Sequence, residues 1–136
     1  MELGLNGQVA LVTGGGQGVG RQICIELATE GARVVVNDLF AERAQAVADE
    51  INAAGGQAYA APADITQLEA VDAMVASAAE HFGAPITVLV NNAAIVRAHD
   101  YANPFTLKAD RAASEIAINL AAPIELARLF LLSRMD

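Results

Sequence analysis

The sequence has little cysteine, lysine and aromatic content, and these shortages exclude several classes of protein. Cys24 is the only cysteine in 136 residues, so the chain has no disulfide framework and no multi-cysteine zinc site. Two distant histidines add no metal-binding pattern, and we predict no metal site. Eight Lys and Arg residues stand against sixteen Asp and Glu, a net charge of −8, which argues against nucleic acid or an anionic membrane surface as partner.

Long hydrophobic runs are also missing. No apolar run reaches the roughly 18–20 residues that a membrane-spanning helix needs, so we expect no membrane insertion. The first residues, MELGLNGQVALVTGG, lack the basic start and cleavage site of a signal peptide. We therefore expect a cytoplasmic location.

What the sequence does contain is a regular alternation of short apolar runs with longer periodic ones. Short β-branched runs that close at turns predict strands, and runs with helical periodicity predict helices between them. This order predicts an α/β fold with a parallel sheet and helices on both faces, formed by residues 1–136 as one unit. The predicted strands span 8–13, 33–37, 57–61 and 86–90, and the predicted helices span 18–30, 41–54, 66–82 and 112–134.

Three local features refine the predicted helices. Thr66 with Glu69 three residues later forms a capping-box pattern at the start of the third helix. Val19 is expected on the apolar stripe of the first helix, together with Ile23. Pro123 falls inside the last helix and should kink or break it.

A glycine-rich turn between the first strand and the first helix is the most informative segment. Gly14, Gly18 and Gly20 allow the backbone to approach a ligand closely, and the helix that follows offers unpaired N–H groups to a phosphate. A tight turn without a ligand is the alternative interpretation. Arg21 and Gln22 follow the last glycine, so the segment lacks the Lys-Ser/Thr of a P-loop, and the context favours dinucleotide binding.

An acidic residue completes this pattern. Asp38 follows the second strand, 18 residues after Gly20, where a carboxylate that binds the adenosine ribose belongs. Its charge would repel a 2′-phosphate, and Gln17 and Leu39 offer no basic group to attract one. We therefore predict NAD rather than NADP as the cofactor.

The chain resembles the short-chain dehydrogenase/reductase family in four motifs that occur in the right order. The family's first-turn motif, Thr-Gly-x-x-x-Gly-x-Gly, is met by residues 13–20, and Asn91-Asn92-Ala93-Ala94 is similar to its Asn-Asn-Ala-Gly. An Asp that meets adenine is matched by Asp64, before Ile65, and an Asn in the following helix by Asn119. The resemblance covers essentially the whole chain.

This resemblance implies a Rossmann-type doubly wound sheet and hydride transfer between NAD and a small-molecule alcohol or carbonyl substrate. It implies a sheet order 3-2-1-4 for the strands present. It also implies a catalytic role for Asn119. The implied cofactor-binding residues are Gly14, Gln17, Gly18, Val19, Gly20, Asp38, Leu39, Asp64, Ile65, Asn91 and Ala93.

One departure from the family pattern concerns the catalytic residues. The family uses Ser with a Tyr-x-x-x-Lys pair, but Ala63 and Phe105 stand four residues after Tyr59 and Tyr101. We therefore expect an incomplete domain, truncated after the fourth strand and the following helix, with doubtful activity of its own. The alternatives are a non-catalytic dinucleotide-binding or interaction module, or one part of a split enzyme completed by another chain, with homo-oligomers also possible.

Overall fold

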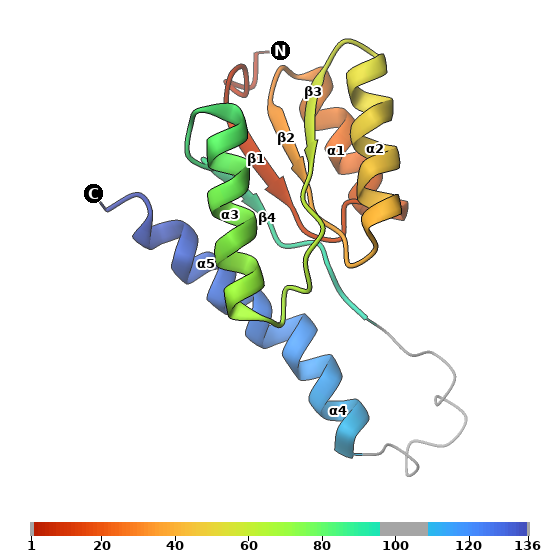
Figure 1. Ribbon diagram of the computed structural model, residues 1–136, viewed down its shortest axis with the longest axis vertical. Coiled ribbons are helices and arrows are strands. Elements are labelled where there is room, and N and C mark those ends of the chain that lie inside the picture. Colours follow the sequence, from red (N-terminus) through yellow and green to blue (C-terminus); the bar gives the residue numbers. More distant parts are fainter. Residues whose placement is uncertain (1, 96–108, 136) are drawn as a thin grey trace.

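The computed structural model describes residues 2–95 and 109–135 (Figure 1). Tyr101 and Phe105, considered above for the family's Tyr-x-x-x-Lys pair, lie outside these residues. Strands and helices alternate through the first ninety residues: β1 Val9–Val12, α1 Gly18–Thr29, β2 Arg33–Val36, α2 Ala41–Ala53, β3 Gln57–Ala60, α3 Leu68–Phe82 and β4 Val88–Val90. The second described segment holds α4 Ala109–Ile116, the π-helical segment η3 Ala117–Ala121 and α5 Ala122–Leu132.

The four strands form one parallel sheet in the order β3-β2-β1-β4, which confirms the predicted sheet order. In the register, Ala10 of β1 lies between Val34 of β2 and Val88 of β4. The chain therefore runs from β1 to β2 and β3 on one side of β1 and then crosses through α3 to β4 on its other side. In such sheets a ligand site forms at the carboxyl ends of the strands, where this reversal opens a crevice.

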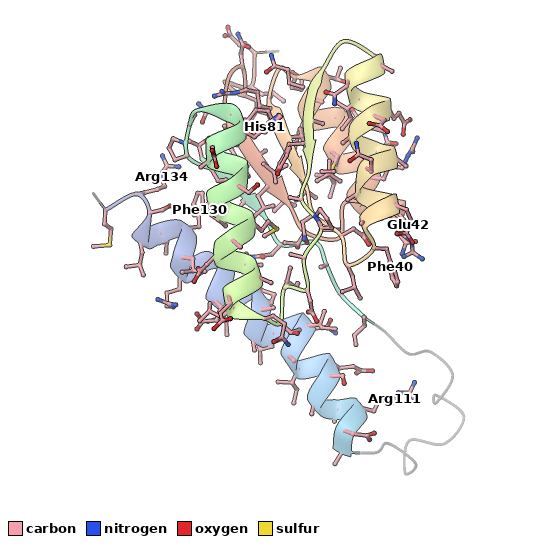
Figure 2. All side chains as sticks on the ribbon, viewed as in Figure 1. Phe40, Glu42, His81, Arg111, Phe130 and Arg134 are labelled. Carbon is pink, nitrogen blue, oxygen red and sulfur yellow. The ribbon has the colours of Figure 1, made fainter. Side chains whose placement is uncertain are left out.

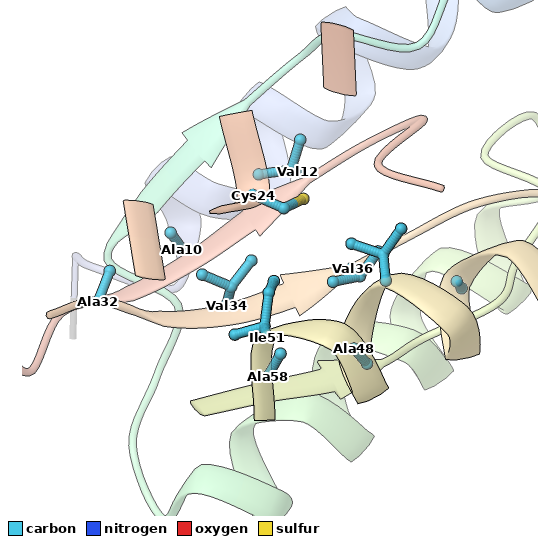
Figure 3. Packing of buried hydrophobic residues seen from close by; sticks show 11 residues of the cluster. Ala10, Val12, Cys24, Ala32, Val34, Val36, Ala48, Ile51 and Ala58 are labelled. Carbon is cyan, nitrogen blue, oxygen red and sulfur yellow. The ribbon is translucent and has the colours of Figure 1, made fainter. Parts of the chain in front are cut away.

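Helices cover both faces of the sheet, and each face has its own core. Because successive strand residues point to opposite faces, Val12 and Val34 share one face, where Val12 lies beside Cys24 of α1 and Val34 beside Ile51 of α2 (Figure 3). On the other face Leu11 packs with Met74 of α3 and with α5. Both faces are thus buried around β1, which explains why these short strands are almost wholly apolar.

Two local predictions about the helices were wrong. Val19 is 72% exposed and does not join the apolar stripe of α1, because it lies in the first turn of the helix and faces the cavity at the carboxyl ends of the strands. The capping box does not form: α3 begins at Leu68 after Gln67, and Thr66 instead bonds to Asp64.

The last predicted helix forms, but Pro123 neither breaks it nor begins it. Helical backbone runs from α4 through η3 into α5, and Pro123 is the second residue of α5. The π-helical turn before it changes the hydrogen-bond pattern where a proline lacks its N–H donor. α4 extends beyond the carboxyl ends of the strands (Figure 1). None of the described helices combines the length and apolarity needed to cross a bilayer.

Candidate functional site

A cavity of about 540 Å³ opens at the carboxyl ends of the strands, beside the point where the strand order reverses. Its walls come from the glycine-rich turn, the start of α2, and the segments after β3 and β4. Its lining residues are Gly14, Gln17, Gly18, Val19, Gly20, Asn37, Asp38, Leu39, Phe40, Arg43, Ala63, Asp64, Ile65, Asn92, Ala93, Ala94, Ile95 and Ile118. Ten of the eleven predicted cofactor-binding residues are therefore brought together at its surface, and Asp38 and Asp64 are among them.

Thr13 joins the glycine-rich turn to the segment after β4. Its hydroxyl oxygen accepts hydrogen bonds from the backbone N–H groups of Asn92 (3.1 Å) and Ala93 (3.0 Å), and Thr13 is only 1% exposed. The amide of Asn92 donates in return to the carbonyls of Thr13 (3.0 Å) and Gly14 (3.2 Å). These contacts hold two walls of the cavity at a fixed separation.

Two glycines of the turn have different physical reasons to be there. A Cβ at Gly20 would overlap the carbonyl oxygen of Gly14 and would lie 2.5 Å from the amide nitrogen of Asn92. Gly18 has φ +54° and nothing within 4 Å of where its Cβ would point, so it faces open space. The turn is therefore packed tightly behind and open towards the cavity, as a cradle for a ligand must be.

The amino end of α1 is suited to an anion. Within the described chain, no side-chain hydrogen bond caps this helix at Gln17 and no acidic residue lies in its first turn. The first N–H groups of a helix lack partners inside it and carry a partial positive charge. Backbone N–H groups at this end are thus the cavity's natural partners for a phosphate group.

Asp38 connects the glycine-rich turn to the turn that precedes α2. One carboxylate oxygen accepts the N–H of Gly16 at 3.1 Å, and the other accepts the N–H of Phe40 at 3.1 Å. The residue is 6% exposed and still lines the cavity. Each carboxylate oxygen can accept more than one hydrogen bond, so Asp38 can hold both turns and also receive ligand hydroxyls.

Arg43 is a cavity residue that the sequence reasoning missed. It is the only Lys or Arg among the described residues that line the cavity, and its guanidinium carbon lies 4.4 Å from the centre of the Phe40 ring. The prediction considered only Gln17 and Leu39 beside Asp38, and it overlooked this basic residue. The sequence does place Arg43 close to Asp38, in the first turn of the helix that follows it. Only the structure shows that this turn faces the cavity.

The segment after β3 forms the opposite wall. Asn37 donates to the carbonyls of Ala61 (3.0 Å) and Ala63 (3.2 Å), which ties this segment to the end of β2. Asp64 follows, exposed, and its carboxylate accepts the backbone N–H and the hydroxyl of Thr66. Asp64 and Ile65 thus face the cavity from a turn with a fixed backbone.

Two predicted residues, Asn91 and Asn119, are absent from the cavity wall in the described structure. The amide of Asn91 donates to the carbonyl of Pro123 at 3.4 Å, and its neighbour Asn92 lines the cavity instead. Asn119, in η3, exchanges two 2.8 Å hydrogen bonds with the backbone N–H and carbonyl of Ile95. Asn119 therefore fastens η3 to the segment after β4, which borders the cavity.

Comparison with known proteins identifies the class to which this fold and site belong. The family model for short chain dehydrogenase matches residues 8–136, and the chain belongs to this family. The chain is 44% identical over 96 residues to (2S)-[(R)-hydroxy(phenyl)methyl]succinyl-CoA dehydrogenase subunit BbsD of Thauera aromatica, which covers 71% of this chain and 38% of that one. It is 45% identical over 91 residues to the 7alpha-hydroxysteroid dehydrogenase of Escherichia coli K12, covering 67% of this chain and 35% of that one.

Solved structures agree on the fold. A 7α-hydroxysteroid dehydrogenase complexed with NADH and 7-oxo glycochenodeoxycholic acid matches with a TM-score of 0.84 and 36% identity, over 93% of this chain and 48% of that one. A metagenomic short-chain oxidoreductase in complex with NADP matches with a TM-score of 0.81 and 37% identity, over 90% of this chain and 54% of that one. The chain thus spans a little over a third of these curated relatives and about half of the solved structures.

Proposed function

We propose that the described cavity binds NAD, and that the protein carrying this chain is an oxidoreductase that transfers hydride between nicotinamide and an alcohol or carbonyl carbon. The observation that carries the proposal is Asp38, a nearly buried carboxylate held between two turns at the edge of a glycine-lined cavity. A charge is costly to bury unless hydrogen bonds compensate it. Its position beside the ligand space supports a binding role in addition to a structural one.

Each wall of the cavity then has a part in binding. In this proposal the amino end of α1, with Gly14, Gln17, Gly18, Val19 and Gly20, holds the pyrophosphate. Asp38 and Leu39 receive the adenosine ribose, and Asp64 and Ile65 border the adenine. Ala93, in the segment after β4, also contacts the cofactor in this proposal. Asn91 is included among the cofactor-binding residues because it precedes Asn92, which lines the cavity.

The nicotinamide, when bound, supplies the hydride donor or acceptor. The chain's own residues bind and orient it. Asn119 exchanges both of its side-chain hydrogen bonds with Ile95, so we assign it a positioning role at the site where the family places a catalytic Asn. No described residue is assigned the role of general acid or base.

A non-catalytic dinucleotide-binding module is the second candidate. The observation in its favour is the sequence itself, in which Lys108 is the only lysine and no Tyr-x-x-x-Lys pair occurs within the 136 residues. Both candidates bind NAD, and they differ in whether these residues suffice for turnover.

Calorimetric titration with NAD tests the shared part of the proposal. Asp38→Asn keeps the size of the side chain but removes its charge, and it should weaken NAD binding at least about tenfold, a change of about 1.4 kcal/mol. Asp49→Asn, an exposed carboxylate on α2, is the matched control and should bind as the wild type does. Absence of binding in a folded wild-type protein would refute the cofactor proposal.

An assay of NAD-dependent alcohol oxidation or carbonyl reduction then separates the two candidates. NAD binding without turnover favours the binding module. Turnover by these 136 residues alone would show that residues other than a Tyr-x-x-x-Lys pair perform the acid–base chemistry.

A further inference from the structure

We propose that Asn52 closes the outer edge of the sheet and thereby keeps the chain from pairing, strand to strand, with a second copy of itself. The inference goes beyond the proposed function and does not depend on it. Asn52 lies in the last turn of α2, at the opposite end of that helix from Phe40 and Glu42, which Figure 2 labels. Phe40 lines the cavity, so Asn52 lies away from the candidate cofactor site.

β3 is an edge strand of the sheet. It stands first in the order β3-β2-β1-β4 and pairs only with β2 (Figure 1). The N–H of Ala61 donates to the carbonyl of Val36 at 2.9 Å, so Ala61 faces β2. In a parallel strand both backbone groups of one residue point to one neighbour, and those of the next residue point to the other side. Ala58 and Ala60 therefore direct their N–H and C=O groups outward, where an edge strand can pair with another chain.

The side chain of Asn52 covers one of these two residues. Its amide nitrogen donates to the carbonyl of Ala58 at 3.0 Å, and its amide oxygen accepts the N–H of Ala58 at 2.8 Å. A side-chain amide has the same donor and acceptor as a peptide group. Asn52 thus takes the place of one residue of a neighbouring strand.

The rest of this edge offers few groups to a partner. In the described part of the chain, no side chain forms a hydrogen bond with the backbone of Ala60, which lines a hollow of about 320 Å³ between β3 and α3. Pro62 is the next outward residue and has no N–H. With Asn52 in place, Ala60 is therefore the outward residue that keeps both a donor and an acceptor.

The sequence of β3 makes a second copy of the chain the partner that an uncovered edge would accept. Residues 57–63 read QAYAAPA and contain no charged side chain, although the chain as a whole has a net charge of −8. Charged side chains on an edge strand are a common protection against pairing, and this strand lacks them. Two copies of one strand can pair antiparallel across a two-fold axis, because each presents the same outward groups. Removing the Asn52 amide would give each copy two pairing residues instead of one.

Sedimentation equilibrium over a range of protein concentrations tests the inference. Asn52→Ala uncovers Ala58 and should tighten the self-association constant at least about tenfold relative to the wild type. Gln45→Ala is the matched control, because it removes an exposed amide that bonds to Asp49 on the same helix, and it should associate as the wild type does.

Two further variants separate pairing at this edge from a general loss of stability. Asn52→Asp keeps an oxygen acceptor for the N–H of Ala58 and places a charge on the edge, so it should associate no more than the wild type. Ala60→Pro, added to Asn52→Ala, removes an outward N–H while leaving the bonds to β2 in place. It should return association to the wild-type level.

Three results would overturn the inference: unchanged association of folded Asn52→Ala, equal association of Asn52→Asp and Asn52→Ala, or association that Ala60→Pro does not reverse. A loss of stability without association would mean that Asn52 only stabilises the turn between α2 and β3. If Asn52→Ala does not fold, Asn52→Ser, which is too short to form both bonds, takes its place.

Hydrogen exchange in the wild type gives a measurement that needs no variant. The N–H of Ala58 should exchange with solvent at least about tenfold more slowly than that of Ala60, and equal rates would also overturn the inference. Failure to bind NAD would refute the proposed function and leave this inference unaffected.

Discussion

Gly20→Ala tests whether the glycine-rich turn is held by close backbone contact. Gly20 is the third residue of α1, and by helix propensity alone alanine would stabilise the protein by about 1 kcal/mol. The structure predicts the opposite sign. The new Cβ would overlap the carbonyl oxygen of Gly14 and lie 2.5 Å from the amide nitrogen of Asn92.

The size of the effect follows from these two contributions. Overpacking a buried position costs typically about 1–3 kcal/mol, and the upper half of that range applies because the obstacle is backbone that Thr13 and Asn92 hold in place. Subtracting the gain in propensity leaves a loss of about 1–2 kcal/mol. For a chain of this length, such a loss lowers Tm by about 4–8 °C.

Thermal and urea unfolding of the wild type and Gly20→Ala measure this difference. Gln22→Ala, on the exposed face of the same helix, is the control and should change the free energy of unfolding by no more than about 0.5 kcal/mol. A Gly20→Ala protein as stable as the wild type, or more stable, would refute the reasoning, because only helix propensity predicts that outcome.

Three further substitutions test other parts of the structure. Thr13→Val removes the acceptor of the N–H groups of Asn92 and Ala93 and should cost about 2 kcal/mol in urea unfolding; an equal loss in Thr13→Ser, which keeps the hydroxyl, would contradict this. Gly83→Ala places a side chain at φ +62°, where α3 ends, and should cost about 1 kcal/mol, whereas no loss would show that the turn can relax. Burial raises the pKa of the Cys24 thiol from 9.0 to about 12, so the folded state retains a proton that the unfolded state releases. The stability that wild type has over Cys24→Ala should therefore be full below pH 9 and decline towards pH 12 in denaturation series; a constant difference would contradict the shift.

The fold was predictable because its signals are local and agree with one another. The β-branched runs that became β1 and β2 lie between clear turn residues, and their burial on both faces follows from a parallel sheet. The positions of Gly14, Gly18 and Asp38 along the chain were enough to place them at one cavity, since parallel strands end at the same edge of the sheet.

The parts that could not be predicted depend on contacts between distant segments. The direction of the first turn of α2 decides whether Arg43 faces the cavity or solvent, and helical periodicity leaves that rotation open. The capping-box pattern at Thr66 competed with Asp64, whose carboxylate accepts both donors of Thr66. The π-helical turn before Pro123 likewise follows from contacts with the rest of the fold that a residue pattern does not contain.

The described polar residues that are buried, Thr13, Asn37 and Asp38, all lie at the carboxyl ends of β1 and β2. The side chain of each forms hydrogen bonds with backbone groups of another segment, so the cavity walls are fixed before any ligand binds. A site built in this way should lose stability and affinity together when these residues change, because the same contacts hold the fold and shape the cavity. Arg43 differs in kind, since it rests on the exposed Phe40 ring at the surface. Substitution of Arg43 is therefore expected to change the free energy of unfolding by no more than about 0.5 kcal/mol, in contrast to substitution of Thr13 or Asp38.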